Sequence, residues 1–88
     1  MHAIIVNVTV HDGPAATTYL REELVPRVSQ APGFVAGYWV RVGANAGRAT
    51  IVCESEEAAQ ALSKQIAPAP NGATTIESVE VGEVVEHA

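Results

Sequence analysis

The sequence predicts an α+β fold of the ferredoxin-like type, in which a four-stranded antiparallel sheet carries two helices in the order βαββαβ. Four segments are rich in β-branched, aromatic and other apolar residues and therefore predict strands: residues 3–10, 34–42, 48–54 and 74–85. Two further segments, 15–30 and 55–66, show apolar residues at helical spacing. Right-handed connections place both helices on the same face of the sheet. We expect residues 1–88 to form a single domain, because a second one would be too small for its own core.

The first strand is predicted to lie in the middle of the sheet. Its alternating positions give apolar side chains to both faces, Ile4, Val6, Val8 and Val10 on one side and Ile5 and Thr9 on the other. A strand with two apolar faces is covered on both sides. Asn7 is the one strongly polar side chain within it. It needs a hydrogen-bonding partner, since an unpaired buried amide costs about 1–3 kcal/mol.

The first helix has a defined start, a weak point and a defined end. Asp12 can cap the free N–H groups, and Pro14 suits the first turn, where its missing N–H would be unpaired anyway. Pro26 interrupts the apolar repeat and predicts a kink or local break near residues 22–23. Pro32 and Gly33 then stop the helix before the second strand.

The second half of the chain predicts a hairpin, a second helix and a last strand. Residues 43–47 supply the glycine and asparagine of a hairpin connection between two strands. Ser55 caps the next helix, which we expect to run to about Ile66. A short proline-containing loop at 67–72 leads to the last strand. Three glutamates in that strand predict a solvated sheet edge: Glu77, Glu80 and Glu83.

The composition argues against several classes of partner. The net charge is −5 and the five cationic residues are scattered, which disfavours nucleic acid and an acidic membrane surface. No apolar run approaches the ~20 residues of a membrane span. The single Cys53 cannot form an internal disulfide, which fits a reducing cytoplasm. Because His2, His11 and His87 lie at the ends of elements, we expect no metal site and no cofactor.

One face of the predicted sheet has no helix to cover it. Apolar residues make up 48% of the chain, and strands 3–10 and 34–42 carry apolar side chains for both faces. An uncovered apolar face of more than a few hundred square ångströms is rare in a soluble monomer. The sequence therefore predicts a homodimer in which two such sheets pack face to face.

Two short motifs resemble a known family. Residues 32–39 (Pro-Gly-Phe-Val-Ala-Gly-Tyr-Trp), followed one hairpin later by residues 54–59 (Glu-Ser-Glu-Glu-Ala-Ala), resemble the antibiotic-biosynthesis monooxygenase (ABM) group. This resemblance implies a dimeric α/β barrel with a ligand cavity between the sheet and the helices of each subunit. The group includes cofactor-free oxygenases of aromatic polyketides, haem-degrading oxygenases and small proteins with no assigned activity.

The resemblance to the haem-degrading branch can be examined residue by residue. That branch uses an asparagine in the first strand, a tryptophan before the acidic start of the second helix, and a histidine on that helix. Asn7 matches the first of these residues, but Cys53 stands where the tryptophan should be. The second helix contains no histidine, and Ser63 lies near the corresponding position. The missing iron ligand argues against haem degradation.

Five residues are candidates for a site. Asn7 either fixes the strand register or faces the cavity and stabilises a substrate anion. Tyr38 and Trp39 alternate in their strand, so one faces the helices and the other the barrel, as packing or as a ring wall for a flat ligand. His11 is the one candidate base, although exposed loop histidines are common. Cys53 is either a small buried hydrophobe or a part of the ligand site.

Two functions follow from these candidates. The first is a cofactor-independent monooxygenase that acts on small phenol-like or quinone-like molecules, with the substrate itself supplying the electrons. The second is a non-catalytic homodimer that binds a small apolar ligand or serves as a stress-associated or interaction module. The scarcity of ionisable residues that could face a cavity favours the second.

Overall fold

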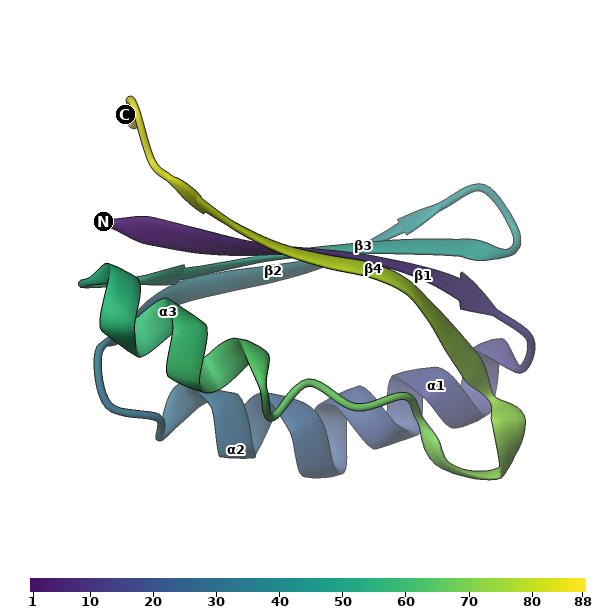
Figure 1. The fold of residues 1–88 in the computed structure, drawn as a ribbon. Helices are drawn as coiled ribbons and strands as arrows, with labels where there is room; N and C mark the ends of the chain where they lie inside the picture. Colours follow the sequence, from purple (N-terminus) through teal and green to yellow (C-terminus); the bar gives the residue numbers. More distant parts are fainter.

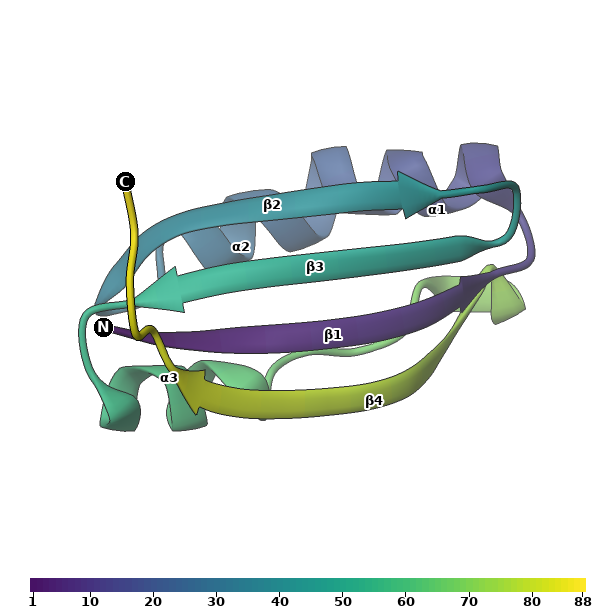
Figure 2. The ribbon, with the colours of Figure 1, turned by 90° about the horizontal axis from the view of Figure 1, so that it is seen from above.

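The computed structural model describes residues 1–88 and has two layers, a four-stranded antiparallel sheet and the helices that cover one of its faces (Figure 1). The strand order is β2-β3-β1-β4, and the view onto the open face shows all strands in front of the helices (Figure 2). This is the ferredoxin-like arrangement that the sequence predicts. No helix is long and apolar enough to pass through a membrane.

The strands lie close to their predicted positions. They are β1 (His2–Val10), β2 (Phe34–Val42), β3 (Ala46–Cys53) and β4 (Thr74–Glu83). β1 pairs with β3 on one side and with β4 on the other, which confirms its predicted central place. β2 and β4 form the edges. β4 ends two residues before the predicted boundary at Val85.

The first helical region is divided by a wider turn. α1 (Gly13–Tyr19) starts at Asp12, whose carboxylate accepts a hydrogen bond from the Ala15 backbone N–H at 3.1 Å. A π-helical segment, η1 (Leu20–Leu24), then leads into α2 (Val25–Ser29). Pro26 has no N–H to give to a carbonyl one turn back, so the preceding turn widens. The predicted irregularity near residues 22–23 is confirmed in this form.

The second helix is shorter than the sequence predicts. α3 (Glu56–Ser63) begins at Ser55, whose hydroxyl accepts a hydrogen bond from the Ala58 N–H at 3.1 Å. It ends at Ser63 rather than near Ile66, and the chain continues irregularly to the short turn η2 (Pro70–Gly72). As Figure 1 shows, α3 covers one end of the sheet, while this irregular segment passes beneath the other end. The short helix leaves space there.

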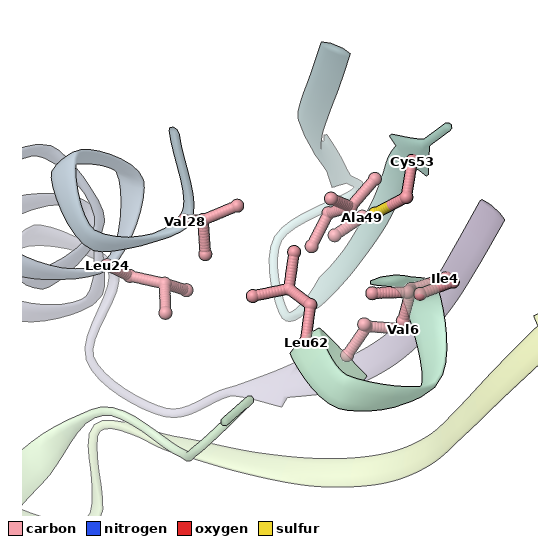
Figure 3. Packing of buried hydrophobic residues seen from close by; sticks show 9 residues of the cluster. Ile4, Val6, Leu24, Val28, Ala49, Cys53 and Leu62 are labelled. Carbon is pink, nitrogen blue, oxygen red and sulfur yellow. The ribbon is translucent and has the colours of Figure 1, made fainter. Parts of the chain in front are cut away.

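The core lies between the sheet and the helices. Its fully buried members come from every layer and include Ile4 of β1, Ile51 of β3, Val28 of α2 and Leu62 of α3. In Figure 3 the side chain of Leu62 lies between those of the first helical region and those of the strands. Burying one such aliphatic side chain contributes about 1.5–3 kcal/mol, so Leu62 is a main link between the layers.

No helix covers the opposite face of the sheet, which has an apolar part and a polar part. The strand register places one row across this face, formed by Tyr38, Thr50, Ile5 and Glu80. The edge formed by β2 is apolar and exposed, since Tyr38 is 67%, Val40 53% and Val42 48% solvent-accessible. The side formed by β1 and β4 is mostly polar. The apolar part is therefore narrower than the sequence predicts, because β1 presents Asn7 and Thr9 on this face.

Candidate functional site

A cavity of about 250 Å³ lies on the helix side of the sheet. It is enclosed by residues of all four strands, by α1 with η1, and by the irregular segment after α3. Fifteen of its 20 lining residues are hydrophobic, including Val6 and Val8 of β1, Leu24 of η1 and Ile76 of β4. The space results from the early end of α3, because no helix fills that end of the layer. A concave apolar space with few polar groups is typical of a small-molecule site.

Two aromatic rings form part of its wall. Trp39 lies opposite Ala49 in the strand register and so faces the helices. Its ring lies back along the strand, because a Cβ added to Gly37 would come within 2.8 Å of Trp39 Cη2 and Cζ3. Tyr19, at the end of α1, is the second aromatic residue of the lining. The sequence analysis missed Tyr19, which lies three residues from the apolar position Ala16 and so on the same helix face.

Arg41 lies where the cavity meets solvent. It is opposite Gly47 in the register, which places it on the helix side of the edge strand β2. Its Nη2 atom lies 3.5 Å from Thr17 Oγ1 on α1, so the side chain extends from the sheet to the helix. Arg41 is exposed and also lines the cavity, which therefore opens at this end.

The lining has few groups that could carry out acid–base or metal chemistry. It contains no histidine, carboxylate, cysteine or lysine, and no cluster of three or more such residues able to hold a metal ion occurs in the chain. The haem-iron ligands histidine, cysteine and methionine are therefore missing from the lining, and only the Tyr19 phenol could approach a metal. These residues do not fit haem. The arrangement can enclose an apolar ring and hold a polar group at the open end.

Asn7 and His11 lie outside the cavity. The side chain of Asn7 is on the open face of the sheet, where its Nδ2 donates to Ser78 Oγ at 2.7 Å. His11 is exposed, and its Nε2 lies 2.9 Å from Thr75 Oγ1. Both side chains contact hydroxyl groups of β4. Their catalytic role stays a prediction that neither position supports, because an acid–base group must lie within hydrogen-bond reach of the reacting atom.

Tyr38 and Cys53 are also away from the cavity. Tyr38 points to the open face, so Trp39 is the one of the two neighbours that faces the helices. Cys53 is fully buried and belongs to the core cluster that also contains Ile4 and Leu62 (Figure 3). Burial raises the pKa of the Cys53 thiol, which keeps it in the neutral, weakly nucleophilic form. The predicted ligand-binding role of these two residues stays a prediction.

The fold and the cavity together define a ferredoxin-like α+β protein with an apolar pocket between sheet and helices. Among solved structures, the chain is similar to the haem-degrader MhuD from Mycobacterium tuberculosis, determined with two haems bound in its active site. The TM-score is 0.55 and the identity 20%, and the match covers 97% of this chain and 98% of that one. This likeness supports the ferredoxin-like fold that the sequence predicts. Neither a family model nor a curated protein matches the chain.

Proposed function

We propose that this protein is a cytoplasmic homodimer in which each subunit binds a small aromatic molecule in the cavity. The observation that carries the proposal is the cavity lining, which combines a large apolar majority with the rings of Trp39 and Tyr19 and contains no general base. Such a lining favours binding over proton transfer. The absence of histidine and carboxylate groups therefore supports the binding function ahead of catalysis.

The size of the cavity limits the ligand. Pockets for drug-sized molecules occupy about 300–1,000 Å³, and this one, at about 250 Å³, lies below that range. One or two fused rings suit it better than a porphyrin. Apolar burial contributes roughly 25 cal/mol per Å² of ligand surface, and an aromatic pair adds about 0.5–1.5 kcal/mol. We expect micromolar rather than nanomolar affinity for a ligand of this size.

Binding can be measured through Trp39, the only tryptophan of the chain. Titration with 2-naphthol should change the emission of Trp39 and saturate. Ala16 is buried on α1 and lines the cavity, whereas its neighbour Ala15 is exposed and does not. Ala16→Leu should reduce binding at least tenfold and Ala15→Leu should not. If Ala16→Leu fails to fold, Ala67→Leu serves instead, since Ala67 lines the cavity from the exposed segment. Saturable binding that none of these variants alters would contradict the proposal.

The open face of the sheet supports the homodimer. Its exposed apolar residues, Tyr38, Val40 and Val42, lie together along β2, and contiguous apolar surface of this kind marks an interface. The same face carries Arg48 on β3 and Glu80 on β4. A two-fold interface brings one surface onto a copy of itself, so Arg48 of one subunit can approach a carboxylate of the other.

The oligomeric state tests this part of the proposal. Sedimentation of the parent at micromolar concentration should give a dimer, and Tyr38→Glu should give a monomer because a charged side chain would replace a large apolar one in the interface. Val85→Glu is the matched control, since Val85 is 87% exposed beyond the end of β4. A folded monomeric parent would refute the dimer and leave the cavity proposal unaffected.

A second candidate is cofactor-independent oxygenation of the bound molecule. The observation that favours it is the water-excluding apolar cavity, together with the likeness to a haem-degrading protein. Oxidation of 1-naphthol to 1,4-naphthoquinone uses one O₂ and yields a new carbonyl and one water, with the naphtholate anion supplying the electrons. Since no base lines the cavity, the substrate must ionise unaided. Oxygen consumption with 1-naphthol, compared between the parent and Ala16→Leu, tests this candidate. Equal rates would exclude it.

A further inference from the structure

We propose that the ligand of the cavity carries an anionic group, such as a carboxylate, and that Arg41 binds this group at the open end. The inference rests on the proposed binding function and adds the chemical class of the ligand, an apolar ring system with one negative charge. It makes Arg41 the residue that determines specificity.

The guanidinium lies between two elements at the cavity mouth. Besides its contact with Thr17, Arg41 approaches the backbone at the start of α1, since a Cβ added to Gly13 would lie 3.2 Å from Arg41 Nη1. Gly13 thus leaves room for the planar group. Arg41 lines the cavity and is also exposed, which suits a long basic side chain whose stem can lie on apolar surface while its charged end reaches solvent. A ligand that fills the cavity would present its outward group to Arg41.

Arg41 has no carboxylate partner. The chain has ten carboxylate side chains against five cations, yet the one ion pair within 4.0 Å joins His2 to Glu56. Asp12, beside Gly13 in the chain, accepts from the Ala15 N–H as the helix cap and forms no ion pair with Arg41. A guanidinium has five N–H donors, and Arg41 uses one of them, in a long contact. The remaining donors can hold a carboxylate in the two-bond geometry that arginine favours.

The other arginine near the cavity does not share this position. Arg48 also contributes to the lining, but the register places its side chain on the opposite face of the sheet. Its Nη1 donates to the Gly47 carbonyl at 2.9 Å. The cavity therefore has one cation free to bind a ligand at its mouth and no carboxylate to repel an anion. A neutral apolar ligand would leave that cation unused.

The test compares two probes of the same shape, 2-naphthoate and 2-naphthamide, by quenching of Trp39. In the parent, 2-naphthoate should bind about tenfold more tightly or better, and the preference should shrink as the salt concentration rises. Arg41→Gln should remove the preference, and Arg41→Lys should keep only part of it because lysine lacks the planar fork. Arg27→Gln is the control, since Arg27 lies on α2 outside the cavity and its loss changes the net charge equally.

Each outcome decides between specific alternatives. Equal binding of the two probes in the parent would overturn the anionic ligand and leave the aromatic cavity intact. A preference that survives in Arg41→Gln, or that disappears in Arg27→Gln, would show that the general field of the protein selects the anion. If neither probe binds, both the proposed function and this inference fail. Urea unfolding of each variant shows whether a loss of binding reflects a loss of fold.

Discussion

Gly37→Ala should change the shape of the cavity while leaving the fold in place. The added Cβ would lie 2.8 Å from two carbons of the Trp39 ring, whereas carbon atoms in contact prefer about 3.5–4.0 Å. The ring must therefore move by roughly 0.7–1.2 Å. Trp39 lines the cavity, so a displaced ring alters the wall against which an aromatic ligand packs. Losing one aromatic contact costs about 0.5–1.5 kcal/mol, which weakens binding of 2-naphthol by roughly two- to tenfold.

The stability of the same variant should change little. Gly37 does not adopt a positive φ, so alanine fits the backbone and gains about 0.4–1 kcal/mol from a less flexible unfolded chain. This gain offsets part of the steric cost. Gly82→Ala is the matched control, because Gly82 lies in β4 and has nothing within 4 Å of an added Cβ. The measurements are Trp39 emission, the Kd of 2-naphthol and the free energy of unfolding in urea. Unchanged emission and affinity in Gly37→Ala would refute the assigned position of the ring.

Three further substitutions are informative. Asn7→Ala should lower the free energy of unfolding by about 1 kcal/mol through loss of the hydrogen bond to Ser78. The Kd of 2-naphthol should not change, and weaker binding would show that Asn7 belongs to the ligand site. Leu62→Ala should cost about 2–5 kcal/mol in urea unfolding, since Leu62 is 1% exposed, and a smaller cost would mean that the layers are held together elsewhere. Burial raises the pKa of the Cys53 thiol in the folded protein. As the pH rises, the thiol of the unfolded chain therefore loses its proton at a lower pH than the thiol of the folded protein. Stability should therefore fall as the pH rises above about 8.5, the ordinary thiol pKa, and Cys53→Ala should lack this decline.

The order of the elements could be predicted because it depends on local patterns. β-branched runs, capping residues at Asp12 and Ser55, and the stop at Pro32 each act on a few neighbouring residues. The same reasoning placed the irregularity before Pro26. The predicted end of α3 was wrong, because Ile66 continues the apolar repeat although the helix has already ended. There the side chain packs against the core from an irregular segment.

The site was harder to predict because it depends on which face each residue occupies. Asn7 and Val6 are neighbours in β1, and a shift of one residue exchanges the two faces of a strand. The alternation of Tyr38 and Trp39 along the strand predicts that they face opposite sides, but it does not indicate which side each one faces. The approach of Arg41 to α1 joins residues far apart in the chain, and no local pattern indicates such a contact. Tyr19 could have been found from its helical spacing to Ala16.

The wide turn ahead of Pro26 also determines which side chains reach the pocket. Successive residues of an α-helix are rotated by about 100° around its axis, and η1 accommodates one more residue per turn than a regular helix. Deleting a single residue from η1 would allow this segment to form a regular α-helix. It would also rotate α1 by about 100° relative to α2. Tyr19 and Leu20 would then point away from the cavity, whereas Val28 would keep its place in the core. Pro26 lies outside the pocket, yet the wide turn before it determines whether Tyr19 faces the pocket.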